Sequence, residues 1–294
     1  MISVVVPLFN KQDSIGSTIN SVLGQSYRDF ELIVVNDGST DRSADIVRQY
    51  DDPRIKLLEK KNGGVSSARN EGIKSAESEY VAFLDGDDLW EPGFLEEIAR
   101  MVEDFPDAGI WGTSYYFLEN GTRRTADKPL PEGYYGIVDN TGWDKAHIYC
   151  SSAVCCKKSA LEQIGLFDER VAYGEDLDVW WRIMLNYPGA FSNKPLAVYR
   201  FDESNRAMTR RKPLEKMHIN YLEKYSEYRR VDESFRHFID KECMWWLFPY
   251  ALEDRNNPNV KRILGQIDLR EYKPSFWFRF RFPKLYNMIK TGRK

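Results

Sequence analysis

Histidine and cysteine are scarce in this chain: its 294 residues include three histidines and four cysteines. No two cysteines have the C-x-x-C spacing of common zinc sites, which argues against a zinc centre. We predict that Cys150, Cys155, Cys156 and Cys243 are free, buried thiols in a reducing compartment.

Long apolar runs are also missing. No uninterrupted run approaches the ~18 residues that a membrane-spanning helix needs. Residues 1–7 lack a basic region and are too short for a signal peptide. A net charge of −3 gives no general argument for nucleic acid as a partner. We therefore expect a soluble, cytoplasmic protein, with at most peripheral contact with the inner face of the membrane.

Four short apolar runs alternate with stretches in which apolar residues recur at helical spacing. The runs are residues 2–6, 30–35, 55–58 and 81–84, and the helical stretches lie near 15–23, 44–50, 66–76 and 94–102. This rhythm predicts an α/β fold with a mostly parallel sheet covered by helices on both faces. Ser66 or Ser67 is expected to cap the third helix.

Polar or glycine-rich residues follow each predicted strand. They are Pro7, Phe9, Asn10 and Asp13 after the first strand, residues 36–41 after the second, Asn62, Gly63, Gly64 and Arg69 after the third, and residues 85–88 after the fourth. Ligands of such sheets bind beyond the carboxyl ends of the strands. Because all four clusters fall on that one edge, the sequence predicts a binding site there.

The densest of these clusters is Asp85-Gly86-Asp87-Asp88. Carboxylates this close repel one another unless a cation or solvent compensates them. Mg²⁺ typically takes one or two carboxylates together with substrate phosphates. Gly86 permits the tight turn that lets the carboxylates converge. Taken alone, the cluster could equally be a solvated acidic turn before a helix.

The second half of the chain is less regular. A strand over 109–118 is expected to turn at Asn120-Gly121 into a partner, and residues 123–145 read as a long loop. A helix from the Gly174-Glu175-Asp176 segment to about Asn186 and a strand over 196–199 follow. Helices are expected over 214–228, 235–252 and 260–267.

These residues resemble glycosyltransferase family 2, the inverting glycosyltransferases of the GT-A fold. The matching segments appear in the family's order and cover roughly residues 2–200: Val4-Val5-Val6-Pro7-Leu8-Phe9-Asn10, residues 34–41, residues 62–72, Phe83-Leu84-Asp85-Gly86-Asp87-Asp88 and Gly174-Glu175-Asp176. The resemblance implies one GT-A domain with a nucleotide-sugar half at 1–115 and an acceptor and base half at 116–205, followed by a helical region at 206–294.

The resemblance also implies roles for individual residues. Those expected on the nucleotide side are Pro7, Phe9, Asn10, Asp37, Arg69, Asp85 and Gly86. Asp87 is the implied ligand of Mn²⁺ or Mg²⁺. Asp88 is expected to support sugar binding or the N-terminus of the next helix, and Glu175 and Trp180 are expected to contact substrate. Local chemistry offers alternatives: Asp37 could satisfy its own turn, and Arg69 could be a helix-surface residue.

Asp176 is the implied general base, which would deprotonate an acceptor hydroxyl for in-line attack on the anomeric carbon. Helical spacing agrees, because Asp178 has Arg182 four residues on as a partner. Asp176, on the nearly opposite side, has no obvious local partner. The alternative is an ordinary acidic first turn of a helix.

One departure from the family pattern is a missing histidine. Many relatives carry one shortly after the strand that corresponds to 196–199, and here the segment is Tyr199-Arg200-Phe201-Asp202-Glu203. Asp202 or Glu203 could replace it as an oxygen ligand, or the contact could be absent.

The C-terminal segment 273–294 contains seven basic residues, no acidic residue and several aromatic ones. This composition suits an interfacial membrane segment or, by stacking, single-stranded nucleic acid. It also suits packing on the helical region or on a second subunit. Peripheral membrane contact and packing on the protein both stay open here, as does the oligomeric state, and we expect no nucleic acid partner.

The sequence thus predicts a metal-dependent inverting hexosyl- or N-acetylhexosaminyl-transferase. It would move a sugar from a nucleotide-sugar, expected to be a UDP-sugar, to a hydroxyl of a glycan or lipid-linked acceptor in surface polysaccharide biosynthesis. The alternatives are a phosphohydrolase of the haloacid dehalogenase type and a non-catalytic nucleotide- or glycan-binding protein.

Overall fold

A computed structural model describes residues 1–127, 129–138, 141, 143–201 and 213–291. It divides into two compact units, the first formed by Met1–Asn140 and Asp144–Arg211, the second by Thr141–Trp143 and Lys212–Lys294. Asp202 and Glu203, the candidates to replace the missing histidine, lie outside the described residues.

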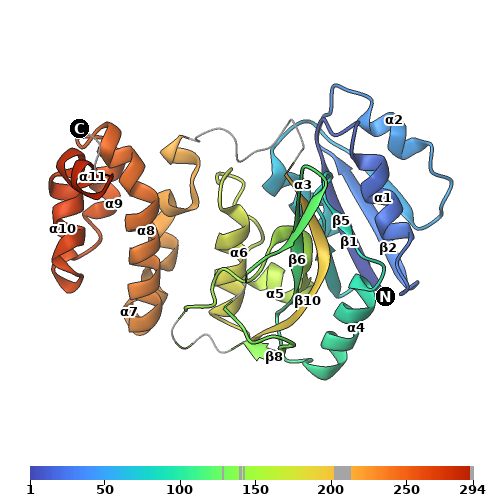
Figure 1. Cartoon of the computed structure of the whole chain (residues 1–294). Helices are drawn as coiled ribbons and strands as arrows, with labels where there is room; N and C mark the ends of the chain where they lie inside the picture. Colours follow the sequence, from blue (N-terminus) through green and yellow to red (C-terminus); the bar gives the residue numbers. More distant parts are fainter. Residues whose placement is uncertain (128, 139–140, 142, 202–212, 292–294) are drawn as a thin grey trace. The chain divides into compact units, whose positions relative to one another are not determined.

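The first unit is built on one ten-stranded sheet (Figure 1). Its strands are β1 (Ile2–Leu8), β2 (Phe30–Asn36), β3 (Ile55–Glu59), β4 (Tyr80–Phe83), β5 (Leu89–Trp90), β6 (Ile110–Glu119), β7 (Thr122–Thr125), β8 (Tyr135–Val138), β9 (Val154–Lys157) and β10 (Gly189–Arg200). The main order is β3-β2-β1-β4-β9-β6-β10-β5, with β7 on β6 and β8 on β10. β1 to β4, β6 and β10 run in one direction, so the predicted mostly parallel sheet is confirmed.

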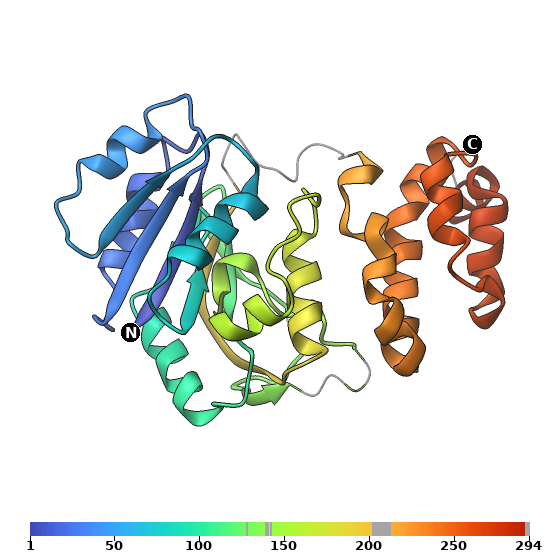
Figure 2. The same cartoon turned by 180° about the vertical axis from the view of Figure 1, so that it is seen from behind.

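Helices cover both faces of this sheet (Figures 1 and 2). One face carries α1 (Ile15–Leu23), α2 (Ser43–Arg48) and α4 (Phe94–Asp104), and the other carries α3 (Val65–Ser75), α5 (Lys158–Gln163) and α6 (Glu175–Met184). The central strands are apolar on both sides because both faces are covered. Val4 and Val6 pack towards α1, for example, whereas Val5 lies against α3.

The second unit is helical, as predicted. Its helices are α7 (Ser226–Val231), α8 (Glu233–Glu253), α9 (Pro258–Leu264), α10 (Pro274–Arg281) and α11 (Pro283–Thr291). The expected helix over 214–228 is wrong in detail: short 3-10 turns precede α7, and Tyr221 interrupts them with non-helical φ and ψ of −113° and 41°. Within the described residues, no helix has the length and apolarity that crossing a bilayer requires.

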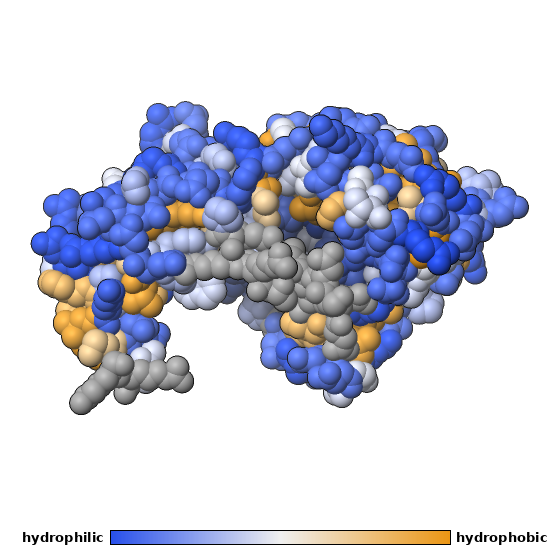
Figure 3. All heavy atoms as spheres, turned by 90° about the horizontal axis from the view of Figure 1, so that it is seen from above, coloured by the Kyte–Doolittle hydropathy of each residue, from blue (hydrophilic) through white to orange (hydrophobic). Residues whose placement is uncertain are grey.

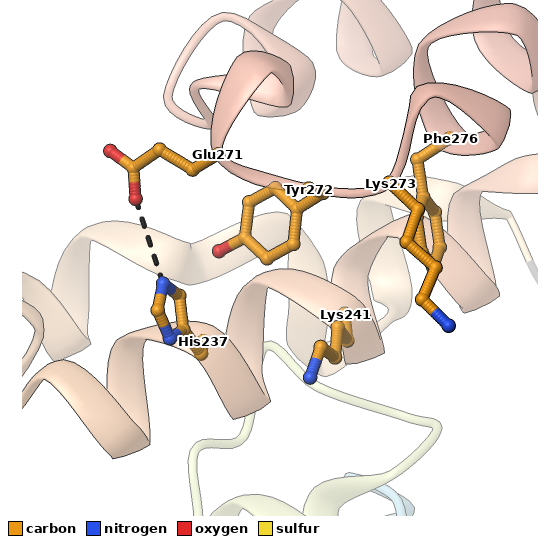
Figure 4. Close-up of a pocket in the computed structure, with 6 residues that line it drawn as sticks. All are labelled: His237, Lys241, Glu271, Tyr272, Lys273 and Phe276. Atoms are coloured by element: carbon orange, nitrogen blue, oxygen red, sulfur yellow. Dashed lines mark ion pairs between the residues drawn. The ribbon is translucent and has the colours of Figure 1, made fainter.

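The second unit also has a hollow of about 420 Å³ between α8 and the segment before α10 (Figure 4). Its lining residues are His237, Lys241, Glu271, Tyr272, Lys273 and Phe276. The carboxylate of Glu271 is already paired with Arg236, and it lies 3.6 Å from His237 Nε2.

Several local expectations need correction. The third helix begins at Val65 after Gly64, which has φ of +92°, and neither Ser66 nor Ser67 caps it. The strand expected over 196–199 extends over 189–200, because an irregularity in the pairing with β6 accommodates Pro195. The stretch 123–145 contains β7 and β8, and Cys150 is only half-buried although all four cysteines are free thiols.

The packing of α3 on β1 leaves no room for a side chain at Gly72. A Cβ there would overlap Cγ1 of Val5 and lie 3.0 Å from Cγ2. Gly72→Ala should lower the free energy of unfolding by about 1–3 kcal/mol through overpacking. Gly16→Ala in α1 is the matched control, since its Cβ would meet Tyr50 Oη at an ordinary 3.6 Å. Urea unfolding should show the control unchanged or more stable by up to about 1 kcal/mol, and equal losses in both variants would contradict this packing.

Candidate active site

The carboxylate of Asp37, just after β2, organises the loop between β3 and α3. It is buried and accepts hydrogen bonds from the backbone N–H groups of Gly63 at 2.9 Å and Gly64 at 2.8 Å. Lys60 Nζ lies 2.7 Å from the same carboxylate and balances its charge. The alternative in which Asp37 satisfies the backbone of its own turn is therefore wrong, because its carboxylate binds the backbone of the neighbouring loop.

The loops after β1 and β2 are joined by Asn10. Its side-chain oxygen accepts a hydrogen bond from Thr40 N at 2.8 Å, and its own N–H donates to Ser39 Oγ at 3.1 Å. Asn10 has a positive φ of 51°, which asparagine tolerates better than most residues. Phe9, one residue earlier, remains 42% exposed. An aromatic ring is thus presented to solvent where the two strands end.

Residues Asp85-Gly86-Asp87-Asp88 form the acidic turn that follows β4, and Gly86 lies where this turn meets β1. A Cβ at this position would lie 3.2 Å from the carbonyl oxygen of Pro7, which is tighter than ordinary contact. The carbonyl of Gly86 accepts hydrogen bonds from Ser14 Oγ at 3.0 Å and Thr18 Oγ1 at 3.1 Å. The backbones of Pro7 and Gly86 therefore lie close together at the edge of the sheet where β1 and β4 end, and no side chain separates them.

The three carboxylates of the acidic turn point to three different partners. Asp85 pairs with Arg69 Nη2 at 2.8 Å, and Asp87 pairs with Lys11. Asp88 is 2% exposed and accepts hydrogen bonds from Ser152 Oγ at 2.5 Å and from the backbone N–H of Arg200 at 3.0 Å.

Burial raises the pKa of Asp88 well above its usual range, and the charges of Asp87 and Asp85 raise it further. The expectation that Asp88 supports sugar binding needs correction, since this carboxyl is enclosed by protein. Its hydrogen bonds to Ser152 and the backbone of Arg200 instead tie the acidic turn to β9 and β10.

Arg69 joins the acidic turn to the start of α6. Its side chain is 3% exposed, with Nη2 on Asp85 and Nη1 at 3.0 Å from Glu175 Oε1. The ring of Phe167 lies 5.3 Å from the guanidinium carbon. Arg69 is therefore not a helix-surface residue, and it brings together two segments that are 90 residues apart in the sequence.

Asp176 occupies the first turn of α6, which begins after Gly174 in the left-handed region at φ of 71°. Its Oδ2 accepts a hydrogen bond from Ser151 Oγ at 2.6 Å, and its Oδ1 accepts one from Leu177 N at 2.8 Å. The predicted pair of Asp178 and Arg182 is present at 2.7 Å, with Asp178 fully buried. Of these two aspartates, only Asp176 remains partly exposed.

Trp180 was expected on the substrate side, and the structure places it in the core instead. Its side chain is 0% exposed, and its ring lies 6.0 Å from those of Phe83 and Phe167. One helical turn beyond Asp176, the side chain already points into the protein. Trp180 therefore packs α6 against the core and does not line the site.

Ser151 and Ser152 were missed by the sequence analysis. Ser152 Oγ donates to Asp88 and accepts from the backbone N–H of Asp85 at 3.2 Å, whereas Ser151 Oγ donates to Asp176. They lie here because β9 runs antiparallel to β4, so that its start meets the edge where β4 ends. Lys11 and Lys60, the counter-charges of Asp87 and Asp37, were also missed. The sequence signal for the two serines was weak: they directly precede the apolar run Ala153–Cys156.

The arrangement fits a divalent cation that takes most of its ligands from substrate. No three histidine, cysteine, aspartate or glutamate side chains converge as a metal cage in the part of the chain that the structure describes. Asp87 offers a hard oxygen that is 17% exposed, with Lys11 as its present counter-charge. One carboxylate with phosphate oxygens and water is a typical Mg²⁺ environment.

Comparison with known proteins decides the family. The family model described as "Glycosyl transferase family 2" matches residues 3–165, more than half of the chain. The chain belongs to glycosyltransferase family 2. The family commonly uses a divalent metal. The haloacid dehalogenase alternative is therefore wrong.

Relatives in this family include glycosyltransferases from several bacteria. RT0329 of Rickettsia typhi is 28% identical, and the alignment covers 79% of this chain and 74% of that protein. Alr2836 of a Nostoc species is 31% identical over 71% of this chain and 67% of its own length. EpsJ of Bacillus subtilis is 38% identical over 45% of this chain, which spans only 38% of EpsJ.

Among solved structures, S. aureus TarS residues 1–349 in complex with UDP-GlcNAc has a similar fold. The TM-score is 0.65 at 20% identity, covering 95% of this chain and 79% of that one. At this identity the likeness concerns the fold, and it confirms the predicted GT-A-like architecture with a C-terminal helical region.

The environment of Glu175 makes stability depend on pH. Burial raises the pKa of Glu175 to about 7 and the charge of Asp176 adds to the rise, while Arg69 opposes it. The folded chain therefore holds this proton more tightly than the unfolded chain, whose glutamate has a pKa near 4.3. The stabilisation is complete below about pH 4.3 and is lost as the pH rises through about 7.

Glu175→Gln removes this titration. Between pH 4.5 and 8, the free energy of unfolding of the wild type should fall relative to that of the variant by up to about 3 kcal/mol. Urea unfolding at a series of pH values measures the difference. Glu162→Gln, at an exposed position in α5, is the control and should show a constant difference. A constant difference for Glu175→Gln as well would contradict the assigned environment.

Proposed function

We propose that this protein is a metal-dependent inverting glycosyltransferase. It transfers a hexosyl or N-acetylhexosaminyl group from a UDP-sugar to a hydroxyl of a glycan or lipid-linked acceptor, in surface polysaccharide biosynthesis. The observation that carries the proposal is the Arg69 bridge, which joins the acidic turn to the residue beside Asp176. A group that could hold the donor diphosphate and a base that could activate the acceptor thereby belong to one network.

The edge formed by the ends of β1, β2 and β4 suits a nucleotide. Phe9 presents a half-exposed aromatic ring, and Asp37 and Asn10 hold the surrounding loops. TarS, which shares the fold, is described with UDP-GlcNAc and supports UDP as the nucleotide. We therefore assign residues 1–115 to the donor, residues 116–205 to the acceptor and base, and 206–294 to a separate helical region.

In the proposed reaction, Asp176 takes the proton of the acceptor hydroxyl while the hydroxyl oxygen attacks the anomeric carbon. The bond from that carbon to the diphosphate oxygen breaks, and the configuration inverts. Ser151 and the N–H of Leu177 each use one lone pair of the Asp176 carboxylate and fix its orientation. Each oxygen keeps a further lone pair for the proton.

Asp87 would hold the Mn²⁺ or Mg²⁺ ion. When bound, the cation neutralises the charge that develops on the departing nucleoside diphosphate. Lys11, at present paired with Asp87, keeps this carboxylate compensated in the free protein.

A donor panel tests the proposal. Incubation with UDP-, GDP- and dTDP-sugars, with and without Mn²⁺, should release UDP from a UDP-sugar only when Mn²⁺ is present, with water taking the sugar in place of the acceptor hydroxyl. Asp87→Asn should weaken Mn²⁺-dependent UDP binding, measured by calorimetry, at least tenfold because a ligand charge is lost. Asp107→Asn, an exposed residue before β6, is the control and should bind normally. Donor binding without any release would instead indicate the non-catalytic alternative, and no binding of any donor would refute the proposal.

Asp176→Asn tests the base separately. The amide keeps the shape of the side chain but cannot take a proton, so the transfer rate should fall about 10²- to 10⁴-fold. UDP binding should stay within about twofold of the wild type, because the acidic turn is unchanged. Transfer to the acceptor is measured as product formed at saturating donor. Full activity of the variant would show that another group acts as base.

A further inference from the structure

The two C-terminal helices, α10 and α11, form a hairpin with two chemically different faces. The inner face packs on α8 through Phe248, whose ring lies 6.2 Å from that of Phe280 and 5.6 Å from that of Tyr286. The guanidinium of Arg279 stacks 3.9 Å from the same Phe248 ring. The hairpin is thus anchored within its own unit and does not need its outer face for folding.

The outer face is a row of large apolar side chains in contact with solvent. Its members are Trp277 at 48% exposed, Phe282 at 43%, Leu285 at 46%, Met288 at 44% and Ile289 at 68%. Leu285, Met288 and Ile289 have the i, i+3, i+4 spacing of one helix face. Figure 3 shows hydrophobic residues gathered on one side of the C-terminal unit. Single exposed apolar residues are common, but a contiguous group marks an interaction site.

The segment that carries this row has charged residues of one sign. Residues 273–294 contain seven basic and no acidic residues, whereas removing these seven from a net charge of −3 leaves −10 for the rest of the chain. Lys284 directly precedes Leu285, and Lys290 directly follows Ile289. The apolar row therefore belongs to a segment whose charged residues are all basic.

We propose that α10 and α11 bind the surface of a bilayer containing anionic lipid. The apolar row, defined as Trp277, Phe282, Leu285, Met288 and Ile289, enters the boundary between headgroups and acyl chains, and the flanking lysines contact lipid phosphates. At about 1.5 Å per residue, α11 is far shorter than the ~30 Å hydrocarbon layer, so it lies along the surface.

The composition of the row favours lipid over the other partners. Three of its five members are aliphatic and cannot stack on bases, which single-stranded nucleic acid would require. Protein interfaces are depleted in lysine, whereas this row is flanked by it. The inference rests on the second unit alone and does not depend on the proposed sugar transfer. A surface-bound enzyme would, however, have direct access to a lipid-linked acceptor.

Vesicle sedimentation of the full chain tests the proposal. The wild type should sediment with vesicles of phosphatidylcholine and phosphatidylglycerol, and at least tenfold more weakly with phosphatidylcholine alone. Lys284→Gln with Lys290→Gln should weaken binding about 30-fold at low salt, at roughly fivefold per lysine. Leu285→Ser, Met288→Ser and Ile289→Ser together should weaken it more than tenfold. High salt should reduce the effect of the lysines because it screens them.

Matched controls come from other surfaces of the same unit. Val231→Ser in α7, at 76% exposed, removes an equally accessible apolar residue, and Arg230→Gln with Lys261→Gln removes two charges. Both should bind vesicles within about twofold of the wild type, and circular dichroism should show every variant folded.

Three results would overturn the membrane inference. The wild type could fail to sediment with anionic vesicles, or the serine variant could bind as the wild type does. Alternatively, analytical ultracentrifugation could show a dimer without lipid that the serine variant dissociates, which would assign the row to a second copy. UDP release from soluble donor is measured without vesicles, so failure of the membrane inference and failure of the proposed transfer remain distinguishable.

Discussion

The buried guanidinium of Arg69 is the interaction on which the candidate site depends. It forms ion pairs with both Asp85 and Glu175. Removing one member of a buried ion pair typically costs about 3–5 kcal/mol, because the remaining charge is left uncompensated. Arg69 therefore holds the acidic turn and the start of α6 at a fixed separation. In the proposed reaction, that separation would set the distance between the donor and the acceptor.

The same site shows how the mutual repulsion of closely spaced carboxylates is offset. The acidic side chains are compensated in different ways: Asp85 and Glu175 share Arg69, Asp37 and Asp87 pair with Lys60 and Lys11, and Asp88 is enclosed by hydrogen bonds. These partners come from α3, strand ends or adjacent loops and differ in burial. The aspartate beside Lys11 remains partly exposed and is suited to exchange its partner for another cation. Asp88 is not, because its donors are part of the fold.

Charge is also separated along the chain. The first unit gathers carboxylates at one edge of its sheet, whereas all charged residues in the segment 273–294 are basic. An acidic site suits a cation and a nucleotide diphosphate bound together, and a basic apolar hairpin suits an anionic surface. The net charge of the whole chain is low because the excess of acidic residues in the rest of the chain and the basic residues of 273–294 largely cancel.

The sequence by itself determined the α/β rhythm, the edge of the sheet that carries the site, and the pairing of Asp178 with Arg182. These follow from local periodicities, which short segments of chain express without knowledge of their neighbours. It could not determine that Ser151 and Ser152 reach the acidic turn, that Asp88 and Trp180 are buried, or that β10 continues through Pro195. The serines reach the turn because β9 runs antiparallel between β4 and β6, whereas the burial of Asp88 and Trp180 and the course of β10 depend on contacts with other elements. Strand direction and such contacts are set by tertiary packing rather than by the residues of one segment.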